Sequence, residues 1–218
     1  MRIKSTVNSM SKYLKTDSPA DIRAELEMLN VSHETIDRLQ IYVDLLAKWQ
    51  ARINLVSGQT LRTVWRRHVL DSLQLLSLLP DQPCRLMDIG TGAGLPGLLL
   101  AIASGHDVHL VESDERKCAF LRTALRETGA QGQIHNLRVE KLPEMEIDVL
   151  TARALAPVAT LLDWTKSLHR PGLKCLFLKG RNLTSELTIM TDWPRVEAQF
   201  HRSLSADDGQ VLELNFMK

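Results

Sequence analysis

The sequence predicts an α/β protein in which helices cover a mostly parallel sheet and a helical extension precedes it. From residue 85 onward, short apolar runs alternate with stretches of helical periodicity, which is typical of a parallel sheet. The first 80 residues show helical periodicity alone. Two strand-like runs near the C-terminus flank the turn signal Asp207-Asp208-Gly209, which indicates a closing antiparallel hairpin.

The N-terminal part divides into a frayed terminus over residues 1–17 and a helical extension over residues 18–84. Ser18 and Ser32 are expected to cap the first two helices, and Pro19 suits a first helical position. A third helix is predicted from about residue 60 to residue 79. Because only the stretch from Pro80 to Pro83 separates this extension from the next unit, we expect the two to pack together.

The α/β unit over residues 85–218 is read as a series of strands and helices. Strands are expected at 85–89, 108–111, 133–139 (weaker), 147–151, 173–178, 195–203 and 211–216. Helices are expected at 95–103, 114–127, 157–168 and 183–190.

Composition narrows the possible functions. Lys and Arg number 27 against 26 Asp and Glu, so any nucleic-acid-binding surface must be local. The cysteines Cys84, Cys118 and Cys175 have neither metal-ligand spacing nor a disulfide framework, so we expect no metal and reduced thiols in a cytoplasmic protein. No apolar run is long enough to span a membrane, and the N-terminus lacks the apolar centre of a signal peptide.

A glycine-rich loop, Asp88-Ile89-Gly90-Thr91-Gly92-Ala93-Gly94, lies between the first predicted strand and a helix. Glycine permits a sharp turn and close approach of a ligand to the backbone, at the sheet edge where α/β proteins bind ligands. Glu112 ends the second strand, where an acid can accept hydrogen bonds from both ribose hydroxyls. Together they indicate an adenosine-containing ligand.

The identity of that ligand depends on Asp88. Residues 92–97 match the G-x-G-x-x-G pattern, so an oxidoreductase with a nicotinamide or flavin cofactor is the alternative. A carboxylate two residues before Gly90 would repel a pyrophosphate, whereas it would attract the ammonium and sulfonium of S-adenosylmethionine. We therefore expect an S-adenosylmethionine-dependent methyltransferase, with Asp88 and Gly92 among the cofactor-binding residues; alternatively, Asp88 only bonds loop amides. Glu140, after Val139 at the end of the third strand, could accept the adenine amino group.

Several blocks outside the loop resemble the glucose-inhibited division protein B family, the RsmG-type guanine-N7 methyltransferases of small-subunit ribosomal RNA. The resemblance covers about residues 24–186. It rests on Trp49 to Leu55, Arg67-His68-Val69-Leu70-Asp71-Ser72-Leu73, Asp88 to Gly97, Arg138 to Glu140, Ala152 to Ala156 and Lys179-Gly180. Gln50 and the segment Glu115-Arg116-Lys117 depart from the family pattern.

The resemblance implies a Rossmann-like, seven-stranded class I methyltransferase fold. It implies methyl transfer to N7 of one guanine in the decoding-region loop of 16S ribosomal RNA, with the RNA or the small subunit as partner. It further implies cofactor contacts at Gly90, Leu95, the Val139–Glu140 pair and Arg153. We expect a monomer; a non-catalytic ribosome-binding module is a third alternative.

The acceptor atom determines which side chains the reaction needs. Guanine N7 has an in-plane lone pair and no proton, so it can attack the sulfonium methyl directly, and alignment supplies the catalysis. No general base or covalent intermediate is then required. Cys84 precedes the first strand, away from the expected methyl site, and residues 151–154 lack the Asn/Asp-Pro-Pro-aromatic clamp of amino-group methylases.

Arg153 ends the fourth predicted strand and is the strongest candidate for a positioning role in catalysis. It could hold the cofactor carboxylate, guanine or phosphate; alternatively, it forms an ion pair with Glu140 or Asp88. Candidate RNA-binding residues are Arg66, Arg67 and Lys179, although such arginines also occur on solvated helix faces. His68 and Asp71 share a helix face and are expected to be a buried polar pair that braces the extension against the loop.

Overall fold

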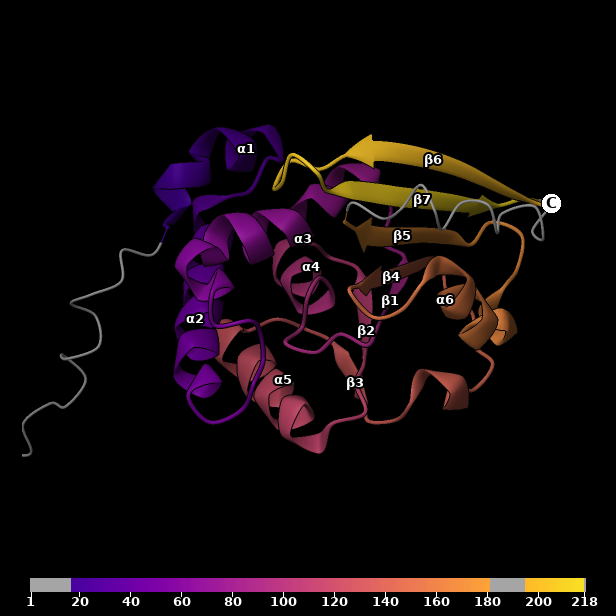
Figure 1. The fold of residues 1–218 in the computed structure, drawn as a ribbon, viewed down its shortest axis with the longest axis horizontal. Coiled ribbons are helices and arrows are strands. Elements are labelled where there is room, and N and C mark those ends of the chain that lie inside the picture. Colours follow the sequence, from indigo (N-terminus) through magenta and orange to yellow (C-terminus); the bar gives the residue numbers. More distant parts are fainter. Residues whose placement is uncertain (1–16, 181–194, 218) are drawn as a thin grey trace, which may run out of the picture.

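A computed structural model describes residues 17–180 and 195–217, and this part of the chain contains the predicted seven-stranded sheet (Figure 1). The strand order is β3-β2-β1-β4-β5-β7-β6. The strands are β1 (Arg85–Ile89), β2 (Asp107–Val111), β3 (Gln133–His135), β4 (Val149–Arg153), β5 (Lys174–Lys179), β6 (Val196–Arg202) and β7 (Gln210–Phe216). The first five strands pair in parallel, whereas β7 pairs antiparallel to both β5 and β6. The predicted fold class is confirmed.

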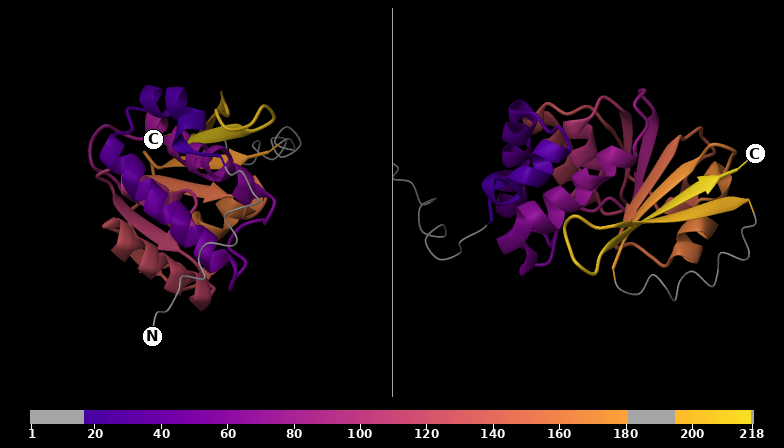
Figure 2. Two further views of the ribbon diagram at one scale, coloured as in Figure 1. Left: turned by 90° about the vertical axis from the view of Figure 1, so that its left-hand side faces the viewer. Right: turned by 90° about the horizontal axis from the view of Figure 1, so that it is seen from above.

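Helices cover both faces of the sheet (Figure 2). The extension comprises η2 (Pro19–Ile22), α1 (Arg23–Met28) and α2 (His33–Gln50), and it lies on the same face as α4 (Gly97–Ala103) and α5 (Glu115–Thr128). Their apolar side chains form one core cluster with Leu86 of β1 and Leu110 of β2. The other face packs against α6 (Val158–Trp164) and η7 (Lys166–Leu168), with Met87 and Phe177 in a second cluster. Successive side chains of each strand point to opposite faces, so the sheet separates two apolar cores.

Local capping explains where several helices begin and end. The Ser18 backbone N–H donates to Asp21 at 2.8 Å, and the Ser32 hydroxyl accepts from the Thr35 N–H at 3.1 Å. Asp114 caps α5 by accepting from the Arg116 N–H at 2.8 Å, and Gly129 ends that helix with φ +66°. The caps predicted at Ser18 and Ser32 are confirmed.

The predicted third helix is a chain of tighter and wider turns. It consists of the 3-10 helix η3 (Thr60–Thr63), the π-helix η4 (Trp65–Leu70), α3 (Asp71–Leu73) and the 3-10 helix η5 (Gln74–Leu78). Apolar periodicity indicates a helix but does not report its pitch, so the sequence could not predict the π-helix. A π-turn is often found at functional sites, because it redirects side chains and carbonyl groups.

Some other boundaries differ from those expected. β3 covers residues 133–135 only, because the chain then turns into η6 (Val139–Lys141). β4 begins at Val149 and ends at Arg153, so it runs two residues further than predicted. The helix expected at 183–190 lies outside the described residues.

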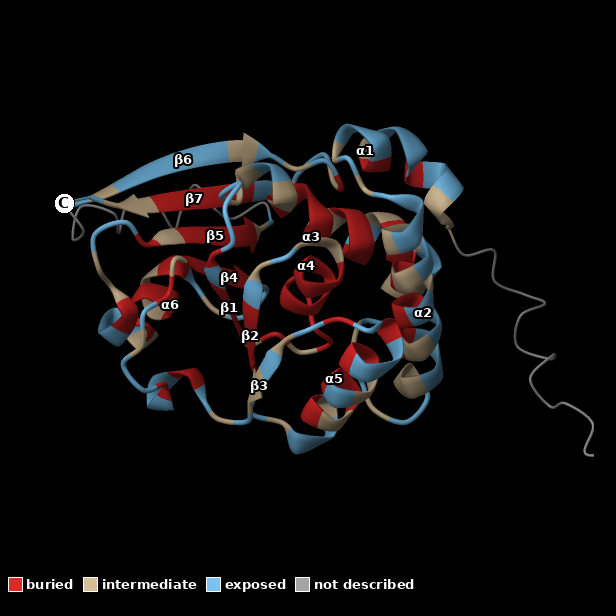
Figure 3. Cartoon of the chain, turned by 180° about the vertical axis from the view of Figure 1, so that it is seen from behind, coloured by how far each residue is buried: buried red, intermediate tan, exposed pale blue. Residues whose placement is uncertain are grey.

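The extension contacts the glycine-rich loop directly. The Tyr42 hydroxyl of α2 donates to the Ala93 carbonyl at 2.8 Å, and the rings of Tyr42 and Trp49 pack edge-on against Phe120 of α5. Helix α4, which follows the loop, is buried from Gly97 to Ile102 (Figure 3). The loop is thus enclosed on its inner side. Among the described residues, no helix is long and apolar enough to cross a membrane.

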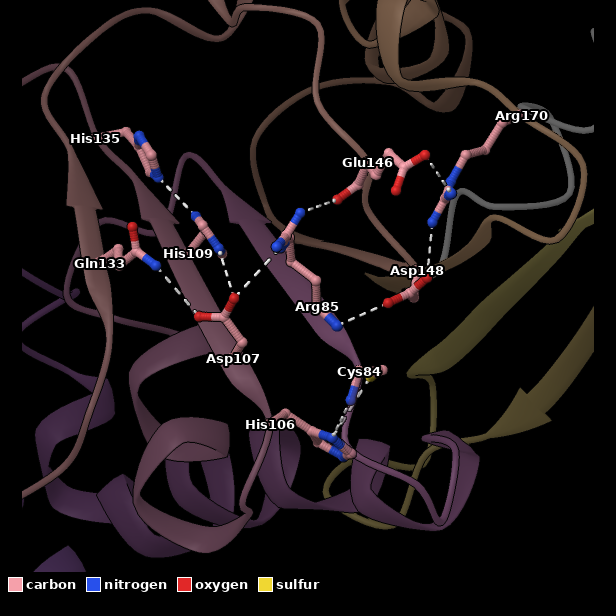
Figure 4. A network of polar contacts seen from close by, with 10 residues as sticks. All are labelled: Cys84, Arg85, His106, Asp107, His109, Gln133, His135, Glu146, Asp148 and Arg170. Atoms are coloured by element: carbon pink, nitrogen blue, oxygen red, sulfur yellow. Dashed lines mark hydrogen bonds and ion pairs between the residues drawn. The ribbon is translucent and has the colours of Figure 1, made fainter.

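A polar network joins the amino ends of the strands, at the sheet edge opposite the loop (Figure 4). The Arg85 N–H donates to Asp148 at 2.8 Å, and its guanidinium lies 3.3 Å from Asp107. Asp107 also contacts His109, whose Nδ1 is 2.8 Å from Nε2 of His135. These contacts align β1, β2, β3 and β4 at their starts.

Candidate active site

Positive φ angles shape the loop after β1. Gly90, Gly92 and Gly94 have φ values of +62°, +58° and +85°, a region that side chains with a Cβ rarely adopt. A Cβ at Gly90 would lie 2.5 Å from Cδ1 of Leu155, so the backbone at Gly90 is closely covered by that side chain. The Thr91 N–H donates to the Val111 carbonyl at 3.0 Å and ties the loop to the end of β2.

Asp88 is fully buried beneath this loop. Its carboxylate accepts from the Thr91 hydroxyl, from the Gly97 N–H at 2.9 Å and from the Thr151 hydroxyl at 2.8 Å. Burial raises the pKa of Asp88 to about 6, against the lowering effect of these donors. Asp88 has no exposed surface, and it holds the loop from within through the Thr91 hydroxyl and the Gly97 N–H. The Gly97 N–H at the start of α4 is thus bonded to this carboxylate.

Glu112 shapes the other side of the loop. One carboxylate oxygen accepts from the Gly92 N–H at 3.0 Å, and the other accepts from the Asp114 N–H at 2.8 Å. Each oxygen retains a second lone pair for a ligand hydroxyl. Glu112 therefore fixes the loop and still faces the adjoining pocket.

That first pocket, of about 330 Å³, lies at the carboxyl ends of β1, β2 and β4. It brings together four predicted residues: Gly90, Glu112, Val139 and Glu140. The other four do not line it. Asp88 is fully buried, Gly92 donates to Glu112, Leu95 is buried in the apolar core, and Arg153 lines a neighbouring pocket. Lys117 and Arg138 also line the first pocket. Sequence reasoning did not select them, although both follow strand ends.

A second pocket, of about 710 Å³, adjoins the first. Its polar lining includes Arg67, Arg153 and Lys179, which lie far apart in sequence. Ala154 and Leu155 line both pockets, so the turn after β4 forms their common wall. Ala154 has φ +50°, an uncommon conformation for a residue with a Cβ. Sequence spacing did not predict that these two residues form a wall, because the wall depends on how the turn is folded.

Arg153 is held from the extension side. Its Nε lies 3.0 Å from Oδ2 of Asp71, and one terminal nitrogen donates to the Arg67 carbonyl at 2.8 Å and to Nδ1 of His68 at 3.0 Å. The alternative prediction, an ion pair of Arg153 with Glu140 or Asp88, is wrong. The ion-pair partner of Arg153 is Asp71. The other terminal nitrogen is buried and has no hydrogen-bond partner among the described residues.

The predicted buried pair of His68 and Asp71 is wrong: His68 is buried and Asp71 half-buried, and each contacts Arg153 instead of the other. Nε2 of His68 lies 2.8 Å from the Thr60 hydroxyl. Burial, together with the charges of Arg153 and Arg67, lowers the pKa of His68 to about 3. The ring is therefore neutral, with Nδ1 accepting from Arg153 and Nε2 carrying the proton.

The three candidate RNA-binding residues divide into two groups. Arg67 is exposed, and it lines the second pocket with Lys179. The Lys179 ammonium also donates to the Ala156 carbonyl at 2.8 Å. Arg66 instead contacts Glu25 at 2.9 Å and the Asp21 carbonyl at 3.1 Å, within the extension. Arg66 therefore has a structural role in packing the extension.

Residues 17–180 and 195–217 contain no group of three or more His, Cys, Asp or Glu side chains that could hold a metal ion. The three cysteines are buried free thiols.

Solved structures share this fold. Ribosomal protein L11 methylase from Lactobacillus delbrueckii superposes with a TM-score of 0.56 at 16% identity, over 75% of this chain and 81% of that one. Precorrin-6y C5,15-methyltransferase from Geobacter metallireducens gives 0.50 at 12% identity, over 76% and 92%. At these identities the likeness concerns the fold alone, which is that of the class I methyltransferases.

Sequence comparison is more specific. Residues 35–211 match the family described as rRNA small subunit methyltransferase G. Relatives of that name are 50% identical over 184 residues in Paramagnetospirillum magneticum, covering 84% of this chain and 90% of the relative, and 43% identical over 213 residues in Parvibaculum lavamentivorans, covering 94% of each. The chain belongs to the rRNA small subunit methyltransferase G family, as the sequence blocks predicted.

Proposed function

We propose that this protein transfers the methyl group of S-adenosylmethionine to N7 of one guanine in 16S ribosomal RNA, the position known as guanine 527. The observation that carries the proposal is the wall of Ala154 and Leu155 between two pockets. One pocket has the lining expected for an adenosine, and the other has the cationic lining expected for RNA. A methyl donor and its acceptor could meet at that wall.

The residues of the first pocket fit the cofactor. Glu112 retains lone pairs for the ribose hydroxyls, and the exposed carboxylate of Glu140 suits the adenine amino group. Gly90 lines this pocket beside Leu155. Arg153 belongs to the adjoining second pocket, and its unpartnered nitrogen suits a carboxylate. When bound there, S-adenosylmethionine supplies an electrophilic methyl group on a sulfonium.

The protein also has to orient the acceptor, guanine N7, toward the methyl group. Guanine N7 carries a free lone pair at neutral pH, so none of the site residues is assigned as a general base. Arg67 and Lys179 can hold phosphate or a base edge at the second pocket. Catalysis by alignment of this kind can supply roughly 7–11 kcal/mol of the barrier. Direct in-line displacement, without a covalent enzyme intermediate, completes the proposed mechanism.

We propose that the protein acts as a monomer in the cytoplasm, on 16S ribosomal RNA or the small subunit. The test uses tritium-labelled S-adenosylmethionine and small subunits or free 16S RNA from cells that lack this protein. We expect one labelled nucleotide per RNA, cleavable at N7-methylguanine by borohydride and aniline. Label at an exocyclic amine or at C5, or RNA binding without any transfer, would overturn the proposal.

A further inference from the structure

Asp71 joins three parts of the molecule that are distant in sequence. Its Oδ2 pairs with Nε of Arg153 at the end of β4, and its Oδ1 accepts from the Ser205 hydroxyl in the turn between β6 and β7. That turn is also anchored to the extension, because the Leu204 N–H donates to the Gln74 side chain at 2.8 Å. Asp71 is only 16% exposed at its side chain, and Arg153 is 14% exposed.

The contacts around Arg153 leave it a single free direction. Asp71 occupies Nε, while the Arg67 carbonyl and His68 occupy one terminal nitrogen. The remaining terminal nitrogen, Nη1, is buried and unpartnered within the described part of the chain. A buried donor without a partner is unfavourable, by about 1–3 kcal/mol, and calls for an explanation. A ligand oxygen in the adjoining site would satisfy it.

Asp71, His68 and the Arg67 carbonyl hold the guanidinium of Arg153 without occupying its free nitrogen. His68 is buried, and its neutral ring can offer Nδ1 as an acceptor only if Nε2 carries the proton, which points to the Thr60 hydroxyl. Asp71 cannot turn away easily, because Ser205 and Gln74 hold its other oxygen. The π-helix Trp65–Leu70 presents the Arg67 carbonyl and His68 to the same guanidinium.

We infer that Asp71 and His68 are positioning residues for methyl transfer, which hold Arg153 so that its free nitrogen meets an oxygen of the bound cofactor or RNA. The inference rests on the proposed function. It gives a specific role to the Arg67-His68-x-x-Asp71 block: the block belongs to the extension, yet it completes a site on the α/β domain. The ligand oxygen belongs either to the cofactor carboxylate or to guanine or phosphate.

A double-mutant cycle tests the inference. The variants are Asp71→Asn, Arg153→Gln and their combination, measured by S-adenosylhomocysteine affinity in calorimetry and by kcat and KM for RNA. We expect each single variant to lower S-adenosylhomocysteine affinity or kcat, or to raise KM for RNA, by about 30-fold or more. The double variant should resemble Arg153→Gln alone, because Asp71 acts through Arg153. A change in S-adenosylhomocysteine affinity assigns the oxygen to the cofactor; a change confined to the RNA parameters assigns it to the RNA.

Variants of His68 provide an independent test of the inference if Asp71→Asn does not fold. His68→Asn keeps an acceptor near the position of Nδ1, whereas His68→Leu removes it, so His68→Asn should retain more activity at equal thermal stability. Glu25→Gln is the matched control. It breaks an ion pair of the same extension, with Arg66, that does not touch Arg153, and kcat/KM should be unchanged.

Two results would overturn the inference while wild-type transfer is intact: independent, additive losses from Asp71→Asn and Arg153→Gln, or wild-type values for folded Asp71→Asn. Absence of transfer by the wild-type protein would instead contradict the proposed function.

Discussion

Oδ2 of Asp71 lies 3.0 Å from Nε of Arg153, and this contact joins the helical extension to the carboxyl end of the central sheet. The extension is therefore part of the site as well as part of the core. The same guanidinium is held by His68, 85 residues earlier in the chain.

Replacing Arg153 by lysine should separate charge from geometry. Lysine keeps a cation beside Asp71 but loses the planar fork that contacts Asp71, His68 and a ligand together. We expect kcat/KM to fall by about tenfold or more, with a smaller loss in unfolding free energy, measured by methyl transfer and urea denaturation. Arg85→Lys, in an ion pair at the opposite sheet edge, should leave kcat/KM unchanged.

Replacing Gly90 by alanine should weaken cofactor binding while the fold survives. The new Cβ would meet Leu155 at 2.5 Å, and φ +62° adds about 1–2 kcal/mol of strain. We expect S-adenosylhomocysteine affinity in calorimetry to fall about tenfold or more. Gly129→Ala is the control, since φ is +66° there and its Cβ would meet nothing within 4 Å. Equal affinity in both variants would remove Gly90 from the site.

The buried His68 should make stability depend on pH. Its pKa falls from 6.5 to about 3 on folding, so the unfolded chain binds the proton more readily. The neutral His68 therefore contributes to the free energy of unfolding in full above pH 6.5. This contribution is lost as the pH falls from 6.5 toward 3, and the loss is about 2 kcal/mol at pH 5. His68→Asn should therefore lose less unfolding free energy than the wild type between pH 7 and pH 5. Parallel curves from urea titrations would contradict the assignment.

Asp88 should have the opposite effect on how the free energy of unfolding depends on pH. Its pKa rises from 3.8 to about 6 on folding, so its charge destabilises the folded protein as the pH rises through this range. Asp88→Asn removes that charge, and the Thr151 hydroxyl can rotate to accept from the amide. We expect this variant to be at least as stable as the wild type at pH 7, whereas Asp88→Ala leaves the Gly97 N–H unpaired and unfolds at lower urea. Equal midpoints for the two variants would show that the bonds of Asp88 do not hold the loop.

The sequence predicted features that arise from local physics. The loop has positive φ angles, which favour glycine. Ser18 and Ser32 cap helices, and the alternation of strands with helices is typical of a parallel sheet. The strand ends also placed Gly90, Glu112, Val139 and Glu140 in one pocket. Each of these depends on spacing along the chain or on the common edge at which parallel strands end.

Only the tertiary structure decided which side chains face one another. Asp88 turns inward to Thr91, Gly97 and Thr151, and Arg66 contacts Glu25 instead of joining Arg67 at the pocket. Arg153 has Asp71 as its partner because packing of the extension places Asp71 beside the carboxyl end of β4. The sequence by itself determined the class of fold, the cofactor loop and the family. The partners of its charged residues were decided by long-range packing, because a buried charge is stable only where folding brings a counter-charge or hydrogen-bond donors to it.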